Sequence, residues 1–243
     1  MSPLENLGVV LGLCAILSLL AFKFKLLTVS GSVASFAVGV VIGWFGSINW
    51  LVLLIVFTLL GFAVTRYKLQ AKINKGLQEG KKGERTYRNV LANGLVPAVI
   101  AIFSWLAGTP ADFASSLVYL AAISVAAADT TASELGILSP KTHLITTFER
   151  VKPGTDGGVS ALGTFAAAVA SAFASILGWL ILLPGKTPDL SILIPLLMGF
   201  LGCMVDSMIG ATLERRRLVS KLGNNIISMA IGSALAFIVV AFA

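Results

Sequence analysis

Three aspartates stand where long apolar stretches of the sequence meet polar segments. Asp129 begins DTTASELG, Asp156 lies within KPGTDGGVSALGT at 152–164, and Asp206 begins DSMIGATLE. Acidic side chains in or beside a membrane span are costly, so they usually face polar cavities and mark functional sites. Three carboxylates from three helices would suit one or two magnesium ions, which prefer oxygen ligands and also bind substrate phosphates. The alternative is that each aspartate caps a helix or pairs with an arginine.

The spacing of Asp129 and Glu134 is unsuited to a single helical site. On a continuous helix of 3.6 residues per turn, two residues five apart point about 140° away from each other. We therefore expect the helix to end near Thr130 or Thr131, so that Glu134 returns from a turn or short re-entrant piece as a metal or nucleotide ligand. Such irregular backbone is tolerated in a membrane where it lines a wet cavity.

Asp206 and Glu214 show the opposite pattern. Gly210 lies one helical turn after Asp206, and Glu214 one turn further, so both acids can lie on one stripe with a glycine between them. A glycine at that position lets a ligand or another backbone approach. We expect a site there, although small residues at this spacing also serve helix packing.

The glycine-rich run 152–164 is typical of a phosphate site. We expect Thr155 or Asp156 to cap a helix that begins at once, so that the next two glycines present N–H groups at the positive end of the helix dipole. No Gly-Lys-Ser/Thr follows, so this is not a Walker A loop. The expected phosphate contacts of the run are Thr155, Gly157, Gly158, Ser160 and Thr164.

Cationic and amide side chains complete the set. Arginine forks suit phosphates, whereas basic residues at a membrane edge mostly meet lipid headgroups. We assign Lys81, Lys82 and Arg215 to Arg217 to membrane topology. The single histidine, His143, provides neither a zinc cage nor a triad. The remaining expected phosphate or nucleotide contacts are Arg85, Arg88, Asn93, Ser133 and Lys152.

The chain that carries these residues has the composition of an integral membrane protein. Of its 243 residues, 57% are hydrophobic and 12% are charged, which is too little polar surface for a soluble core of this size. The first apolar stretch indicates a membrane span and not a removable signal peptide. A crossing helix needs about 20 mostly apolar residues. The stretches of about that length are 4–22, 26–46, 48–65, 89–107, 111–129, 158–183, 189–212 and 223–243.

The basic residues give the expected orientation. All but Lys186 lie in alternate connecting segments, which the positive-inside rule places in the cytoplasm, with both termini on the other side. The same rule accounts for the net charge of +7 without nucleic acid. We predict an all-α polytopic bundle of about eight transmembrane helices, a single domain over 1–243. Its polar active-site loops, 66–88, 129–158 and 212–222, face the cytoplasm.

The motifs RTYRNVLANG, DTTASELG, KPGTDGGVSALGT and DSMIGATLE, in this order, resemble the integral membrane family that includes plant and cyanobacterial phytyl-phosphate kinase. The resemblance covers approximately residues 82–228. It implies phosphorylation of an isoprenoid monophosphate to the diphosphate, with CTP as donor and Mg²⁺ or another divalent cation, on the route from phytol toward tocopherol. It also implies a distant relation to dolichol kinase and to CDP-lipid synthases.

The resemblance also implies particular site residues. One departure is LGNNIISM at 222–229, where Ser228 stands in place of an expected asparagine, which leaves the roles of Asn224 and Asn225 open. We assign Asp129, Asp156 and Asp206 to the metal, and expect the isoprenoid tail in a groove between spans. The matching motif residues are Arg88, Asn93, Asp129, Ser133, Glu134, Thr155, Asp156, Ser160, Thr164 and Asp206.

Two other functions remain open from the sequence. A cytidylyltransferase that forms a CDP-activated lipid would use the same metal and triphosphate site. A secondary transporter would use interrupted helices and buried acids near the middle of the membrane. Against transport, the acids cluster toward one face and the halves show no evident inverted repeat. The sequence leaves the choice between a monomer and a homodimer open.

Overall fold

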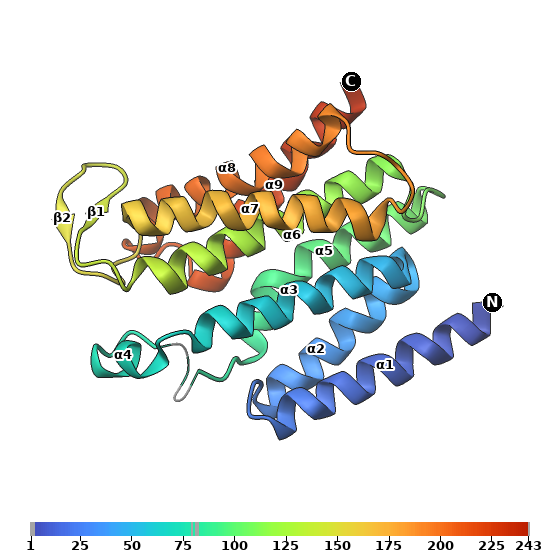
Figure 1. The fold of residues 1–243 in the computed structure, drawn as a ribbon, viewed down its shortest axis with the longest axis horizontal. Coiled ribbons are helices and arrows are strands. Elements are labelled where there is room, and N and C mark those ends of the chain that lie inside the picture. The colour runs from blue at the N-terminus through green and yellow to red at the C-terminus, as the bar shows by residue number, and fades with distance from the viewer. Residues whose placement is uncertain (1–2, 79, 81–82, 243) are drawn as a thin grey trace.

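The structure, a computed structural model, describes residues 3–78, 80 and 83–242. Lys81 and Lys82, assigned above to topology, lie outside these described residues. Eight long helices in the described chain are apolar enough to cross a membrane (Figure 1). This confirms the predicted membrane helix bundle. The helices are α1 (Pro3–Lys23), α2 (Val29–Val41), α3 (Ile48–Arg66), α5 (Tyr87–Leu106), α6 (Phe113–Gly136), α7 (Ala161–Leu182), α8 (Leu193–Ile209) and α9 (Lys221–Phe242).

Short elements extend or connect these helices. A π-helical turn, η1 (Ile42–Gly46), continues α2, another, η3 (Gly210–Glu214), continues α8, and the 3-10 turn η2 (Leu190–Ile192) precedes α8. The short helix α4 (Leu69–Asn74) follows α3. The segment before α7 forms a small antiparallel sheet, so the all-α description needs this one addition. Its strands are β1 (Thr142–Leu144), β2 (Arg150–Val151) and β3 (Gly158–Val159), in the order β2-β1-β3.

Helix α6 forms the centre of the bundle, because it packs against α7, α8, α9, α3 and α5. It is the least apolar of the eight spans but the most buried. Small side chains explain both facts, because they let neighbouring helices approach closely. Ala122 and Ala128 are completely buried, and the hydroxyl groups of Ser124 and Ser175 hydrogen-bond between α6 and α7 at 3.2 Å.

An aromatic contact ties α3 to α6 at the opposite end of the bundle from the polar segments. The rings of Trp50 and Tyr119 stack with centroids 4.1 Å apart. Tyr119 also donates a 2.8 Å hydrogen bond to the carbonyl of Trp50, and the Trp50 indole donates to Ser116. Both polar tips are thus satisfied in the core, as buried Tyr and Trp require.

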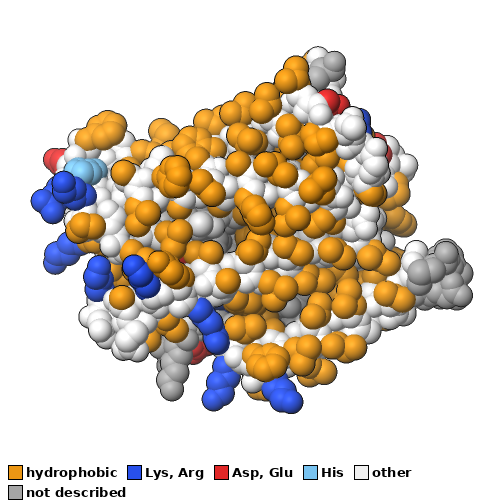
Figure 2. Space-filling view, viewed as in Figure 1, with side chains coloured by type: hydrophobic (Ala, Val, Ile, Leu, Met, Phe, Trp, Pro, Cys, Tyr) orange, Lys and Arg blue, Asp and Glu red, His pale blue; other side chains and the backbone are white. Residues whose placement is uncertain are grey.

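The two ends of the bundle differ in charge. Both termini lie at the end away from α4 and the small sheet (Figure 1). Most of the Lys and Arg side chains visible on one face lie along the left and lower edges of the view, toward the end that carries α4, β1 and β2 (Figure 2). The fold therefore collects the polar segments far apart in the sequence at one end.

Candidate active site

Asp129 lies on a helix that does not end where its spacing from Glu134 predicted. Instead of stopping near Thr130 or Thr131, α6 continues to Gly136, so Asp129 and Glu134 point to different sides of one helix. The predicted helix end was wrong, although both acids still line one cavity, described below, from a single continuous helix. Glu134 has partners of its own, which are described next.

Glu134 is held inside the protein by residues from α3 and α4. One carboxylate oxygen accepts a 2.6 Å hydrogen bond from Lys72 Nζ, and the other accepts a 2.8 Å hydrogen bond from Thr65 Oγ1. The Lys72 side chain is completely buried and also donates to the carbonyls of Val64 and Thr65. This buried ion pair fixes α4 against α6.

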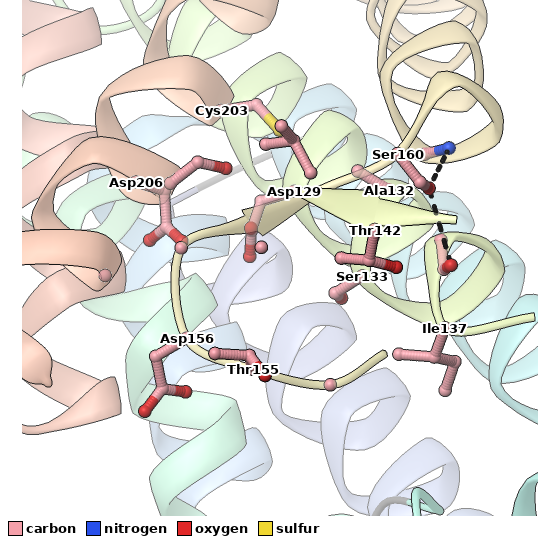
Figure 3. A pocket seen from close by; sticks show the side chains of 18 of the residues that line it. Asp129, Ala132, Ser133, Ile137, Thr142, Thr155, Asp156, Ser160, Cys203 and Asp206 are labelled. Atoms are coloured by element: carbon pink, nitrogen blue, oxygen red, sulfur yellow. Dashed lines mark hydrogen bonds between the residues drawn. The ribbon is translucent and has the colours of Figure 1, made fainter. Parts of the chain in front are cut away.

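Asp129 of α6 and Asp206 of α8 face each other with their carboxyl groups in hydrogen-bonding range (Figure 3). Helix α9 supports both. Asn225 Nδ2 donates to Asp129 Oδ2 at 3.1 Å, and Ser228 Oγ donates to Asp206 Oδ1 at 3.2 Å. Two adjacent carboxylates repel each other unless a proton or a cation lies between them.

A polar cavity of about 320 Å³ surrounds this pair. We call it the acidic cavity, because its walls carry Asp129, Asp156, Asp206 and Glu214 together with Glu134. Its one described lysine or arginine is Lys221. The other predicted site residues that line it are Ser133, Thr155, Gly157, Gly158, Ser160 and Thr164.

The three aspartates assigned to a metal do not converge on one point. Within the described residues, no three His, Cys, Asp or Glu side chains form a metal-binding group. Asp129 and Asp206 form a close pair, whereas Asp156 is exposed at the cavity wall. The acids thus share one cavity, with two of them in contact.

The glycine-rich run does not begin a helix at Thr155 or Asp156, as predicted. The cap of α7 is Ser160, whose hydroxyl accepts a 3.1 Å hydrogen bond from the Gly163 amide. Strand β3 comes first and takes up Gly158, so the glycines are not at the helix N-terminus. The Gly158 amide donates to the Thr155 carbonyl at 2.8 Å, which closes a turn.

The glycines of this run instead permit a close approach between the turn and η3. Gly157 has a positive φ of 71°, and a Cβ there would overlap the backbone of Ala211. A Cβ at Gly210 would in turn lie 2.7 Å from the amide nitrogen of Gly157. The two glycines therefore let the loop that carries Asp156 lie directly on the helix that carries Asp206.

Asn224 of α9 connects the two acids of the DSMIGATLE motif. Its Nδ2 donates to the Asp206 carbonyl and to Glu214 Oε2, both at 3.0 Å. Its Oδ1 is buried and has no hydrogen-bond partner in the part of the chain that the structure describes. Asp206 and Glu214 both line the acidic cavity, but Gly210–Glu214 is the π-helical turn η3 and not the α-helix that the predicted stripe assumed.

A second cavity, of about 510 Å³, receives the predicted cations. Arg85, Arg88 and Asn93 line it from α5 and the segment before α5, and none of the three lines the acidic cavity. We call it the basic cavity. The two cavities share the wall residues Asp129, Ser133, Glu134, Lys221 and Asn225. The single polar constellation expected from the sequence is thus two adjoining cavities.

The cations of the basic cavity differ in their surroundings. Arg85 is 8% exposed, donates from Nη2 to Thr65 Oγ1 at 2.9 Å and lies over the Phe62 ring. Arg88 is exposed, with its guanidinium beside the neighbouring Tyr87. Lys152, also predicted to bind phosphate, is exposed and lines neither cavity.

Several residues of the site were not assigned from the sequence. Lys221 was given no role in the site, yet it lies in the wall shared by both cavities. The role of Asn225 was left open, and Ser228 was noted only as a departure from the asparagine expected there. Both residues contact the aspartate pair. A signal existed, because adjacent asparagines near the start of an apolar span are costly unless they serve a polar site.

The fold and its two cavities define a polytopic membrane protein with a polar site at one end of the bundle. The chain belongs to the family described as integral membrane protein DUF92, whose profile matches residues 12–234. This confirms, at the level of the family, the resemblance drawn from the motifs. No solved structure gives a significant match.

Three curated relatives show how widely the sequence pattern occurs. An uncharacterized membrane protein of Methanocaldococcus jannaschii is 32% identical, over 98% of this chain and 96% of its own length. One from Synechocystis is 36% identical, over 79% of this chain and 74% of its own. The chloroplastic protein VTE6 of Arabidopsis thaliana is 30% identical, over 89% of this chain and 66% of its own.

Proposed function

We propose that the protein is a membrane kinase that phosphorylates an isoprenoid monophosphate to the diphosphate, with CTP as donor and a divalent cation. The observation that carries the proposal is the Asp129–Asp206 pair in a cavity that adjoins a second, cationic cavity. The similarity to VTE6 and the motif resemblance to phytyl-phosphate kinase support it.

The donor set of the acidic cavity fits Mg²⁺. Two carboxylates in contact favour a cation between them, and Mg²⁺ is usually bound by one or two carboxylates together with waters and substrate phosphates. Asp129 and Asp206 would hold it, with Asp156 and Glu214 in the same cavity for its waters or a second ion. When bound, the cation neutralises charge on the triphosphate.

The remaining walls of the acidic cavity suit a triphosphate. Thr164 lines it, and its hydroxyl is a donor that would suit a phosphate oxygen. Ser133 and Thr155 also line it, but their hydroxyls donate to the carbonyls of Thr130 and Lys152. The cation at this wall is Lys221, within electrostatic reach of Asp129, Asp206 and Glu214. Lys221 therefore balances part of the acidic charge where the γ-phosphate would lie.

The proposed chemical step is a direct phosphoryl transfer. An oxygen of the acceptor phosphate forms a bond to the γ-phosphorus. The bond between that phosphorus and the β,γ-bridging oxygen breaks, and the leaving CDP retains the electron pair. A deprotonated phosphate oxygen needs no strong general base, so positioning and charge neutralisation dominate. Lys221, in the wall shared by both cavities, is placed to stabilise the transferring group.

An apolar groove supports a lipid substrate. It measures about 370 Å³ and lies between α3, α6 and α7. Phe165, Val169 and Phe173 line it and are at least half exposed, so it opens at the outer surface of the bundle. We place the isoprenoid tail in this groove. Basic residues gather at the end of the bundle that holds the two polar cavities, and by the positive-inside rule they support a site that faces the cytoplasm.

The test is transfer of label from CTP. Purified protein in detergent receives phytyl monophosphate, Mg²⁺ and CTP labelled at the γ-phosphate. We expect labelled phytyl diphosphate and release of CDP. Release of pyrophosphate with unlabelled lipid would show a cytidylyltransferase instead. Counterflow of a solute in proteoliposomes without nucleotide would show a transporter.

A further inference from the structure

We propose that the basic cavity is a separate binding site for the monophosphate headgroup of the lipid acceptor. The acidic cavity would then serve the nucleotide alone. The inference rests on the proposed function in one respect, that the acceptor is a phosphorylated lipid. It goes further by assigning the two substrates to the two sides of the wall that contains Asp129, Lys221 and Asn225.

The charges of the two cavities support this division. The acidic cavity has acids from four segments and one described lysine or arginine, so a phosphate there requires metal cations. The basic cavity has Arg85, Arg88 and Lys221. Of its two acids, Glu134 is paired with Lys72, and Asp129 has no such ion pair among the residues that the structure describes. A phosphate monoester is therefore favoured in the basic cavity without a metal.

The geometry lets two bound phosphates meet at one place. Asp129, Lys221 and Asn225 belong to the wall between the cavities. Asn225 orients Asp129 through its 3.1 Å hydrogen bond. A phosphate on either side of this wall would be next to Lys221, which is the arrangement that transfer between them requires.

The inner end of the basic cavity has an apolar neighbour. A small cavity of about 60 Å³ shares Arg85, Asn89 and Asn93 with the basic cavity, and beyond them it is lined by Leu54 and Phe57. Phe57 also lines the apolar groove. Polar and apolar surfaces are thus adjacent, as a phosphorylated lipid needs.

Arg88 is the residue to change, because it is exposed and its loss leaves no buried partner unpaired. We expect Arg88→Gln to raise the KM for phytyl monophosphate about tenfold, the usual worth of a charged hydrogen bond. The KM for CTP should stay within a factor of about two, because Arg88 does not line the acidic cavity. Arg88→Lys should restore part of the loss, and Arg216→Gln, an exposed arginine outside both cavities, should change neither KM.

Binding without nucleotide separates this inference from the proposed function. Isothermal titration calorimetry measures the binding of phytyl monophosphate, phytol, phosphatidic acid and inorganic phosphate to the protein in detergent. We expect phytyl monophosphate to bind tightest, with a loss of about tenfold in Arg88→Gln. Equal binding of phosphatidic acid would show that the cavity binds bulk phospholipid. Binding of inorganic phosphate alone would show that the cavity does not bind a phosphorylated lipid.

The outcomes of the two assays distinguish the claims. Wild-type transfer with an Arg88→Gln defect in the KM for CTP would overturn the separate acceptor site while the kinase proposal stands. Binding of phytyl monophosphate that depends on Arg88, without any transfer from CTP, would support the site and overturn the kinase. Unchanged kinetics and binding in Arg88→Gln would overturn the assignment of this cavity.

Discussion

Asn225 of α9 donates a 3.1 Å hydrogen bond to Asp129 of α6, and three residues further along the same helix Ser228 donates to Asp206 of α8. One face of α9 therefore fixes both members of the carboxylate pair. The pair is positioned by the packing of three helices, α6, α8 and α9, which contact one another. This arrangement makes the pair a single unit, and the first two predictions follow from it.

Replacement of either aspartate of the pair should greatly slow transfer, and the losses of kcat in the two single variants should not add up in the double variant. We expect Asp129→Asn and Asp206→Asn each to lower kcat at least about 100-fold, the usual cost of losing one electrostatic stabiliser of a transition state. The double variant should be no worse than the poorer single variant, because residues that act as a unit are not additive. Steady-state kinetics with labelled CTP checks this. Asp189→Asn, before η2 at the other end of the bundle, is the control, and additive losses would argue against one shared function.

Ser228 should be replaceable by asparagine but not by alanine. Ser228→Ala removes the 3.2 Å hydrogen bond to Asp206 and should lower kcat/KM about five- to tenfold. Ser228→Asn keeps a donor at this position, and asparagine is what the motif resemblance led us to expect there. Its activity should stay within about threefold of the wild type. If both variants lose activity alike, the packing volume and not the hydrogen bond is what matters.

The spans could be predicted from the sequence because they depend on length and apolar composition alone. The alternation of basic segments supported the same count, and the structure has eight such helices in its described part. The limits near the site were less predictable. Asp129 was placed at the end of a span, whereas α6 continues seven residues further to Gly136. Composition could not reveal this, because the partner of Glu134 is Lys72, far away in sequence.

The candidate site was predictable by residue type and less so by arrangement. The motif residues around Asp156 and Asp206 do line one cavity. Their glycines were taken for a helix N-terminus, but β3 intervenes and Gly157 packs against Ala211 instead. The separation of Arg88 from Asp156 and Asp206 also required the fold, since it depends on where the start of α5 packs in the bundle. Local patterns do not contain such contacts between segments.

Gly157→Ala should damage the acidic cavity more than a simple backbone strain would. At a φ of 71° an alanine pays about 1–2 kcal/mol, and here its Cβ would also overlap the Ala211 backbone. We expect the loop that carries Asp156 to move away from η3, with a loss of kcat of at least about tenfold. Gly185→Ala is the matched control, because Gly185 also has a positive φ but an added Cβ meets nothing within 4 Å. An equal loss of kcat in the two variants would mean that backbone strain alone, and not the contact with Ala211, causes the effect.

The Lys72–Glu134 ion pair should stabilise the fold because each buried charge is neutralised by the other. Removal of one member leaves a buried charge unpaired, so we expect Lys72→Met to cost about 3–5 kcal/mol. The double variant Lys72→Met with Glu134→Gln leaves no charge and should be more stable than Lys72→Met alone. Melting temperatures in detergent for the four proteins of the cycle measure this coupling. A double variant that is less stable than both single variants would contradict a pairwise role.

Filling the apolar groove should affect long acceptors more than short ones. Ala170 lines the groove between α3, α6 and α7, so Ala170→Phe places a ring where we propose the isoprenoid tail lies. We expect the KM for phytyl monophosphate to rise about tenfold. Each CH₂ group excluded from the groove loses about 0.8 kcal/mol of binding free energy, so the exclusion of two such groups is enough for a tenfold change. The KM for a five-carbon prenyl monophosphate, which leaves most of the groove unfilled, should change less. Ala168→Phe, on the exposed side of α7 outside the groove, adds the same ring and should change neither value. An equal rise for both chain lengths in Ala170→Phe would place the tail elsewhere on the bundle.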